Sequence, residues 1–337
     1  MERKFLNQCL SQNTIIIKKR MLYFFLIIIS SGNAQNKNIP VVSSQELYAV
    51  KEFKNIEYAK GYSHSSLNSD SKKIVSLKLD AYVPNSSVKN RPAMILIHGG
   101  GFTGGDKNHR HIVSMSKKFA AQGWVVFSIN YRLKKNLGTV PKEFVSLIDK
   151  KNIPRKERAY AIYPANRDAK AAVRWVYANA ENYDINTDYI TVGGGSAGAI
   201  IAVQLGVTNP DDYTSEISLS EDKTLETTHL KESSKVHTIL DFWGSATAVK
   251  ILEGMSNKNR FNIKNASLLI VHGTKDPTVS FEEAKLLKKI YSKTGVTHVF
   301  YPVEGAGHGV WEKKINGKSL SELSFDFIVK SQNIKVE

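Results

Sequence analysis

Cysteine is almost absent from this sequence, which has one, Cys9, among 337 residues. Because Cys9 precedes the apolar run that we interpret below as an export signal, the mature chain would contain no cysteine. That excludes a disulfide framework and a cysteine nucleophile. No other segment of the sequence is long and apolar enough to cross a bilayer. The sequence also has no visible repeat of about 20–50 residues, which excludes a repeat architecture.

Acidic residues are the minority charge class, and the formal net charge is +16. This excess could favour an anionic polymer or surface, or it could simply keep an exported protein soluble. The lysines are scattered and are not interleaved with aromatic residues, so nucleic-acid binding is not indicated. With 42% hydrophobic and 23% charged residues, the composition is that of a globular protein.

The N-terminal region predicts export. A basic cluster at residues 18–20 precedes an apolar run at 22–29 that is too short to span a membrane, and small residues follow it. We therefore expect residues 1–34 to be a cleaved signal peptide, which sends the protein to the periplasm or outside the cell without stable membrane insertion. An uncleaved anchor is the alternative. A polar stretch at 35–45 and a single domain at 46–337 are expected to follow.

Short apolar runs alternate with longer amphipathic stretches along this domain. The pattern predicts an α/β fold with a mostly parallel sheet and helices on both of its faces. Two segments with period-two alternation come first and predict edge strands. Strands are expected at 46–58, 73–84, 93–97, 124–130, 189–193, 236–242, 267–272 and 297–303, and helices at 109–122, 165–183, 199–205, 281–294 and 319–330.

Two insertions interrupt the alternation, at residues 134–163 and 209–235. The first contains Pro141 and Pro154, and the second is rich in Asp, Glu, Ser and Thr. We expect both at loops on the carboxyl edge of the sheet, where ligands bind in such folds. Each could be a lid or a wall for the substrate, or solvated decoration, and the sequence does not choose between these.

Two glycine-rich loops predict the halves of an acyl-transfer site. The run Gly194-Gly195-Ser196-Ala197-Gly198 lies between a predicted strand and a predicted helix, which is typical of a nucleophile elbow. The turn is too tight for a Cβ at the flanking positions, and it exposes the serine hydroxyl. The run His98-Gly99-Gly100-Gly101-Phe102 follows an earlier strand and offers bare backbone N–H groups to an oxyanion. We expect Ser196 to be the nucleophile.

Position in the chain predicts a base and an acid for this serine. His308 lies in a glycine loop after the last predicted strand, and Asp276 follows the preceding strand, where Pro277 fixes the turn. Asp241, which also ends a strand, is the rival acid or a loop cap, and Glu304 is expected near the surface. His98 is expected to brace the glycine loop. The other histidines are interpreted as packing residues (His237, His272, His298) or surface residues (His64, His109, His111, His229).

The motifs together resemble the α/β-hydrolase superfamily, in particular esterases and lipases similar to hormone-sensitive lipase and to bacterial carboxylesterases. The order serine, aspartate, histidine is the one found in that superfamily. The resemblance covers about residues 70–330, and it rests on the two glycine runs and on Asn130-Tyr131-Arg132-Leu133, Asp168-Ala169-Lys170-Ala171, Asp276-Pro277 and Gly307-His308-Gly309. It implies that Gly100, Gly101 and Ala197 donate their N–H groups to the oxyanion, and that residues 130–133 are structural.

We therefore expect a serine-dependent carboxylic ester hydrolase that forms an acyl-enzyme and acts on short-chain or carbohydrate-linked esters, with no metal or organic cofactor. Phe102, Trp243 and Trp311 are candidates for the substrate pocket and, equally, for the core. The run Asp184-x-Asn186-x-Asp188 looks like part of a calcium loop but lacks the other ligands, so a turn is expected there. A serine peptidase of the prolyl-oligopeptidase type and a non-catalytic binding protein remain as alternatives. The oligomeric state is not predicted.

Overall fold

A computed structural model describes residues 38–151 and 156–337, so the expected signal peptide at 1–34 lies outside the described residues. Residues Ile39–Glu337 form one compact unit. Among the described residues, no helix combines the length and the hydrophobicity that a membrane span requires.

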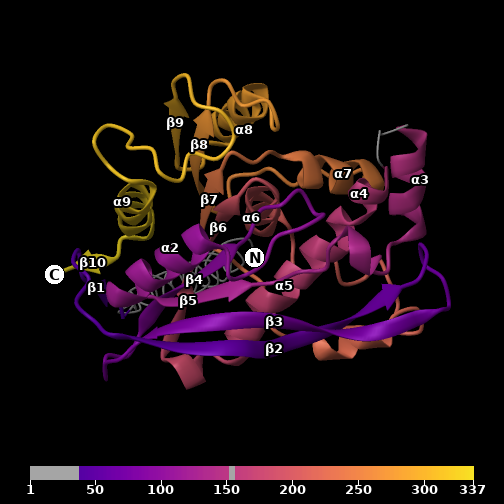
Figure 1. The fold of residues 1–337 in the computed structure, drawn as a ribbon, viewed down its shortest axis with the longest axis horizontal. Coiled ribbons are helices and arrows are strands. Elements are labelled where there is room, and N and C mark those ends of the chain that lie inside the picture. Colours follow the sequence, from indigo (N-terminus) through magenta and orange to yellow (C-terminus); the bar gives the residue numbers. More distant parts are fainter. Residues whose placement is uncertain (1–37, 152–155) are drawn as a thin grey trace, which may run out of the picture. The chain divides into compact units, whose positions relative to one another are not determined.

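The described chain has an eight-stranded sheet at its centre, with the strand order β2-β3-β5-β4-β6-β7-β8-β9 (Figure 1). The long strands β2 (Val50–His64) and β3 (Lys72–Pro84) pair antiparallel, and β3 is antiparallel to β5 (Val125–Ile129). From β5 to β9 all neighbours are parallel. The predicted mostly parallel sheet is thus confirmed. Its other strands are β4 (Arg91–Ile97), β6 (Ile185–Gly195), β7 (Thr238–Phe242), β8 (Ser267–Gly273) and β9 (His298–Val303).

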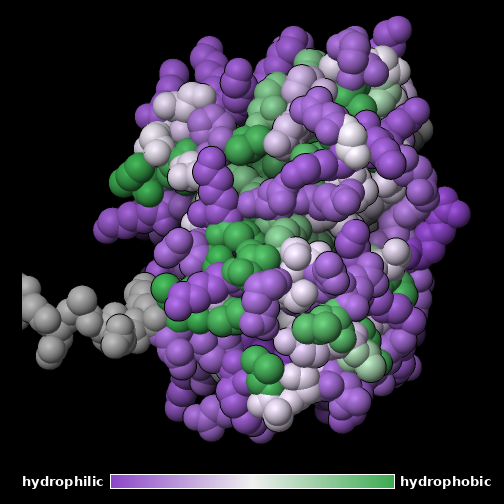
Figure 2. Space-filling view, turned by 90° about the vertical axis from the view of Figure 1, so that its left-hand side faces the viewer, coloured by the Kyte–Doolittle hydropathy of each residue, from purple (hydrophilic) through white to green (hydrophobic). Residues whose placement is uncertain are grey.

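Helices cover both faces of this sheet, because the central strands are apolar on both sides. Met94 and Leu96 of β4 pack in one buried cluster, and Ile95 and Ile97 pack in another. The first cluster includes side chains of α2 (Arg110–Ala121) and α9 (Leu320–Gln332). The second includes side chains of α5 (Ile162–Ala178), α6 (Ala197–Val207), α7 (Thr247–Ser256) and α8 (Phe281–Thr294). On the face drawn in Figure 2, hydrophilic residues predominate and hydrophobic residues form a few patches between them.

Element boundaries differ from the predictions where tertiary pairing decides them. β2 lies further along the chain than the predicted strand at 46–58, because its polar second half is held by its pairing with β3. α5 ends at Ala178, before a 3₁₀ turn at Glu181–Tyr183. α8 matches the predicted helix at 281–294, since the Ser280 side chain caps its first turn and Gly295 ends it with a φ of 74°. Two short strands, β1 (Val41–Val42) and β10 (Lys335–Val336), pair in parallel outside the main sheet.

The placement predicted for the insertion at 209–235 is wrong. α6 begins at the carboxyl edge of the sheet and leads away from it, and the chain then enters β7 at that strand's amino end. Both ends of the insertion therefore lie at the amino edge, and its middle runs along α5. Tyr213 packs against Tyr163 of α5 with ring centroids 4.9 Å apart, and Thr227 Oγ1 accepts a hydrogen bond of 2.8 Å from the N–H of Lys60 in the edge strand β2. This segment therefore packs against α5 and does not form a wall of the site.

The insertion at 134–163 does follow the carboxyl end of a strand, β5. Its described part forms a 3₁₀ turn at Lys134–Asn136 and two helices, α3 (Lys142–Lys150) and α4 (Lys156–Tyr160). Phe144 and Ile148 of α3 are buried in the core, as their helical spacing suggests. This insertion, unlike the other, is placed to contribute to a site at the carboxyl edge.

Candidate active site

Ser196 occupies a sharp corner between β6 and α6. Its backbone is in a left-handed conformation, with a φ of 57° and a ψ of −121°, which is strained for a residue with a side chain. A Cβ on Gly194 or on Gly198 would lie 2.2 Å or 2.1 Å from the carbonyl oxygen of Ile97. Glycine is therefore required on both sides of the corner, and the elbow predicted from the sequence is present.

The structure brings together the three residues predicted to do the chemistry. His308 Nε2 lies 3.0 Å from Ser196 Oγ, and His308 Nδ1 lies 2.7 Å from Asp276 Oδ2. These side chains come from the carboxyl ends of β6, β8 and β9, which the parallel sheet places at one edge. With Nδ1–H donated to the carboxylate, Nε2 is the nitrogen that can accept the serine proton.

Asp276 is held as a carboxylate by the donors around it. Its Oδ1 accepts backbone N–H bonds from Thr278, at 2.8 Å, and from Val279, at 3.0 Å. Burial alone would raise the pKa of Asp276, but these donors and the bond from His308 keep that pKa below its ordinary value. The carboxylate is thus fixed in place and charged, as an acid that orients a histidine needs to be.

His272 contributes to this arrangement, which the sequence analysis did not anticipate. It is fully buried, its Nε2 lies 2.9 Å from the Val279 carbonyl oxygen, and the same nitrogen is 3.3 Å from Asp276 Oδ2. Burial lowers the pKa of His272, so the ring is neutral and donates from Nε2. Its position at the end of β8, four residues before Asp276, was the available signal. The sequence predicts only a packing role for His272, whereas the structure also places its Nε2 beside the Asp276 carboxylate.

The first glycine loop packs directly against the elbow. A Cβ on Gly99 would lie 2.8 Å from the Gly195 carbonyl oxygen and 3.4 Å from Ser196 Cβ. Gly100 and Gly101 have φ values of 108° and 60°, in the region that favours glycine. The loop predicted to supply oxyanion donors therefore lies beside the predicted nucleophile.

His98 braces this loop, as expected. Its ring stacks on Tyr131 with centroids 4.4 Å apart, and its Nδ1 lies 2.7 Å from the Gly99 carbonyl oxygen. Tyr131 also donates its hydroxyl to the His98 carbonyl oxygen, at 3.0 Å. Burial lowers the pKa of His98, so its ring is neutral and structural. Of the histidines expected on the surface, His64 is in fact buried and lies 3.0 Å from Thr139 Oγ1.

Ser196 and His308 open onto a pocket of about 440 Å³. Two of the predicted pocket residues, Trp243 and Trp311, line it and meet edge to face with ring centroids 5.0 Å apart. The third, Phe102, lines an adjoining pocket of about 380 Å³ whose other apolar walls are Ala159, Ile162, Ile200, Ile251 and Val279. Sequence reasoning missed four further lining residues, which lie in none of the motifs: Gly105, His109, Arg158 and Thr278.

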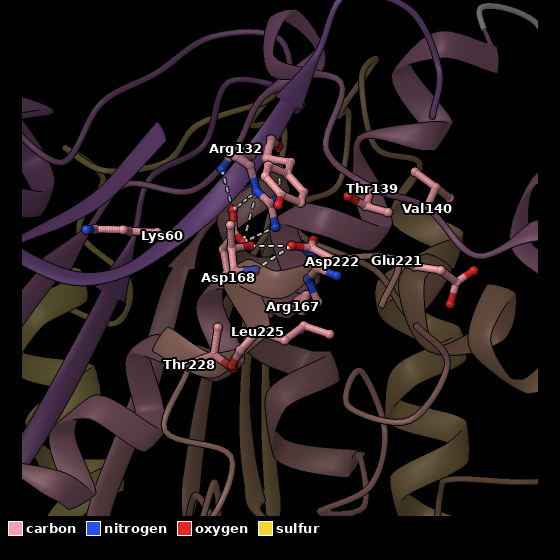
Figure 3. A network of polar contacts seen from close by, with 12 residues as sticks. Lys60, Arg132, Thr139, Val140, Arg167, Asp168, Glu221, Asp222, Leu225 and Thr228 are labelled. Carbon is pink, nitrogen blue, oxygen red and sulfur yellow. Dashed lines mark hydrogen bonds and ion pairs between the residues drawn. The ribbon is translucent and has the colours of Figure 1, made fainter. Parts of the chain in front are cut away.

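A buried network of charges holds the strand end beneath the site (Figure 3). Asp168 Oδ1 and Oδ2 accept hydrogen bonds from the Arg132 guanidinium and backbone N–H at distances from 2.6 to 3.1 Å. A second ion pair lies beside it, in which a guanidinium nitrogen of Arg167 is 2.5 Å from Asp222 Oδ2. Burial would lower the pKa of Arg132, but Asp168 and, more weakly, Asp222 hold it above its ordinary value. Residues 130–133 are structural here, as the resemblance implied.

The other acidic candidates have different environments. Asp241 is completely buried, and its Oδ1 accepts the Gly244 N–H at 2.9 Å, so it caps the loop after β7. Glu304 is exposed and accepts a hydrogen bond from Thr274 Oγ1 at 3.2 Å. The turn expected at residues 184–188 is present only at Asp184, which has a φ of 57° and pairs with Lys89, because β6 already begins at Ile185. Within the described ranges, no group of three or more metal-ligating side chains is placed to hold an ion.

The buried carboxyl group of Asp241 should make the stability of the folded protein depend on pH. Burial raises the pKa of Asp241 to about 7, whereas an unfolded aspartate titrates at about 3.9. The folded state is therefore favoured below about pH 4, and this advantage is lost as the pH rises to about 7. Asp241→Asn cannot ionise at this position, so it does not undergo this loss. We therefore expect the free energy of unfolding of Asp241→Asn minus that of the wild type to be higher at about pH 8 than at about pH 4.5, by a few kcal/mol. Urea unfolding at both pH values measures this, and equal differences would contradict it.

Comparison with known sequences identifies a matching family profile and several related esterases. The BD-FAE family profile matches residues 79–144 and 152–267, which is more than half of the chain. Esterase LipC of Mycobacterium tuberculosis is 22% identical over 239 residues, which cover 66% of this chain and 53% of LipC. Esterase LipQ of the same organism is 22% identical over 266 residues, which cover 71% of this chain and 55% of LipQ. The chain thus spans about half the length of these curated relatives.

Solved structures agree in fold. An esterase from Thermogutta terrifontis, Est2 with propionate bound, aligns with a TM-score of 0.56 at 22% identity and covers 84% of this chain and 94% of its own. A truncated carbohydrate esterase from gut microbiota aligns with a TM-score of 0.55 at 22% identity and covers 87% of this chain and 99% of its own. At such identity these likenesses concern the fold, while the profile match identifies the family. The chain belongs to the BD-FAE family and has the α/β-hydrolase fold.

Proposed function

We propose that this protein is a serine-dependent carboxylic ester hydrolase that works through an acyl-enzyme. The observation that carries the proposal is the hydrogen-bonded chain from Ser196 Oγ through His308 to Asp276, with distances of 3.0 and 2.7 Å. A glycine loop beside the hydroxyl supports it, as does a pocket large enough for a small acyl or alcohol group. The names of the relatives, which are esterases, point in the same direction.

In the proposed mechanism, Ser196 Oγ attacks the ester carbonyl carbon while His308 Nε2 takes the hydroxyl proton. The tetrahedral intermediate collapses, the bond to the alcohol oxygen breaks, and His308 returns the proton to the leaving alcohol. Water then attacks the acyl-enzyme and gives a proton to His308, and the acid leaves as Ser196 regains its hydrogen. Asp276 keeps the imidazole in the required tautomer throughout.

The negative charge of each tetrahedral intermediate needs donors close to Ser196. We assign this role to the backbone N–H groups of Gly100, Gly101 and Ala197. Ala197 is the first residue of α6, so its N–H has no partner within the helix. The helix N-terminus also favours negative charge. A donor of this kind typically contributes about 10²–10³ in rate.

Short-chain or carbohydrate-linked esters are the substrates that we propose. The pocket at Ser196 and its apolar neighbour, of about 440 and 380 Å³, suit small groups on either side of the scissile bond. One structural neighbour is named a carbohydrate esterase. Export through the signal expected at residues 1–34 would bring the enzyme to such material, and it forms part of the same proposal.

A covalent label tests the proposal directly. Est2 has been solved after phosphorylation by paraoxon. We expect paraoxon to add one diethyl phosphate to Ser196 of this protein, located by peptide mass spectrometry, with activity lost in proportion to labelling. A 4-nitrophenyl ester should also give a burst of nitrophenol when acyl-enzyme hydrolysis is the slower step. An intact protein with no adduct at Ser196 would overturn the proposal, and faster cleavage of the matching 4-nitroanilide would favour a peptidase.

A further inference from the structure

Arg158, in α4, places its guanidinium at the entrance to the site. A Cβ built on Gly101 would lie 3.0 Å from one guanidinium nitrogen of Arg158 and 3.3 Å from its central carbon. The charged group therefore lies directly against the backbone of the loop to which we assign the oxyanion donors. Arg158 also lines both the pocket at Ser196 and the adjoining pocket. Among the described residues of the insertion at 134–163, it is the one that lines the Ser196 pocket.

The charge of Arg158 has no counterpart in the pocket. The Ser196 pocket is otherwise lined by glycines, Ser196, Thr278, two tryptophans and two histidines, and no carboxylate is among these described lining residues. Arg132, Arg167 and Arg260 are buried, and each pairs with an aspartate, whereas Arg158 is exposed to solvent. Within residues 38–151 and 156–337, the Arg158 side chain forms no ion pair and no hydrogen bond with another residue.

We infer that the natural substrate carries a carboxylate close to its scissile ester and that Arg158 binds this carboxylate. The inference rests on the proposed esterase function and adds a substrate class to it. A guanidinium presents parallel N–H donors that match the two carboxylate oxygens, and it remains charged at any physiological pH. A free guanidinium beside a nucleophile selects for negative charge, because a neutral ester leaves it without a partner.

The adjoining pocket limits where that carboxylate can lie. Its lining includes Glu283, whose Oε2 is buried and has no hydrogen-bond partner. A substrate carboxylate placed deep in this pocket would meet a second negative charge next to apolar walls. The anionic group therefore belongs on the Ser196 side of Arg158, and the adjoining pocket takes an uncharged part of the substrate.

The carboxylate can belong to the acyl part or to the alcohol part of the ester. Two pairs of substrates, each an anionic ester and its neutral counterpart, distinguish these two cases. Mono-4-nitrophenyl adipate against 4-nitrophenyl hexanoate tests a carboxylate on the acyl side. The 3-acetoxybenzoate anion against its methyl ester tests a carboxylate on the alcohol side. The measured quantity is the ratio of kcat/KM for the anionic ester to kcat/KM for the neutral ester, in wild type, Arg158→Gln and Arg158→Glu.

We expect at least one ratio to fall about tenfold in Arg158→Gln and further in Arg158→Glu, and the pair that responds identifies the side of the ester. Raising NaCl from about 0.05 to about 0.5 M should weaken the wild-type preference, because salt screens exposed charges. Arg110→Gln is the matched control, since Arg110 is 80% exposed, does not line the pocket and carries the same charge. Its ratios should equal those of the wild type.

Ratios that change by less than about twofold in both Arg158 variants, or that fall equally in Arg110→Gln, would overturn the inference. Such a result leaves the esterase proposal intact, because neutral esters are still cleaved. Failure of the esterase proposal looks different: all four substrates would be inert, or their cleavage would persist in Ser196→Ala. The two failures are therefore separable within one set of assays.

Discussion

Replacing Ser196 with alanine should lower kcat for ester hydrolysis by about 10⁴- to 10⁶-fold while the protein stays folded. The hydroxyl oxygen is the atom that forms the covalent bond, and no other described hydroxyl lies at His308 Nε2. Alanine meets the same backbone conformation as serine, a φ of 57°, so the corner should keep its shape. Residual turnover would come from the remaining oxyanion donors and from binding.

The measurement is steady-state hydrolysis of a 4-nitrophenyl ester, with thermal unfolding of the same samples. Ser116→Ala serves as a control, because Ser116 lies away from the pocket and donates to the Ile112 carbonyl oxygen within α2. That variant should keep its activity to within a few-fold. If Ser196→Ala hydrolyses the ester at the wild-type rate, the nucleophile is another group and the mechanism proposed here is wrong.

Replacing Asp168 with alanine should destabilise the protein by about 3–5 kcal/mol, which is a large fraction of the roughly 5–15 kcal/mol that holds an ordinary domain folded. The Arg132 side chain is only 2% exposed, and Asp168 accepts hydrogen bonds from its guanidinium and from its backbone N–H. Alanine would leave that guanidinium buried without its main partner. The nearby Asp222 lowers this cost only in part, because it is already paired with Arg167.

Urea unfolding would measure this loss. Glu282→Ala is a suitable control, since its ion pair with Lys285 is exposed on both sides and should matter little. Adding Arg132→Met to Asp168→Ala should recover stability, because it removes the buried unpaired charge. A loss in Asp168→Ala no larger than in the control would show that the network is not a support of the fold.

The parts of the structure that follow local rules were predictable from the sequence. The glycines around Ser196 are required by close backbone contacts, so the motif itself indicates the corner. The apolar runs of the central strands are buried on both faces, which makes them recognisable as parallel strands. From a known strand order, the placement of Asp276 and His308 at one edge follows directly.

The remaining features depend on contacts between distant segments. α7 was not predicted: it is only 10 residues long, and its last turn contains Gly254, which weakens the helical pattern. The insertion at 209–235 was assigned to the wrong edge, since the direction of α6 was not followed through to β7. Arg158 lies in no motif, and only the folding of its insertion against Gly101 brings it to the site.

The position of the base within the sheet has a further consequence. His308 follows β9, the outermost strand, whose residues are half-exposed, whereas Ser196 follows β6 in the fully covered middle of the sheet. Outer strands open locally at a lower free energy than central ones. Fluctuations too small to unfold the molecule can therefore separate His308 Nε2 from Ser196 Oγ, so the proposed catalysis would be lost at milder conditions than the fold itself.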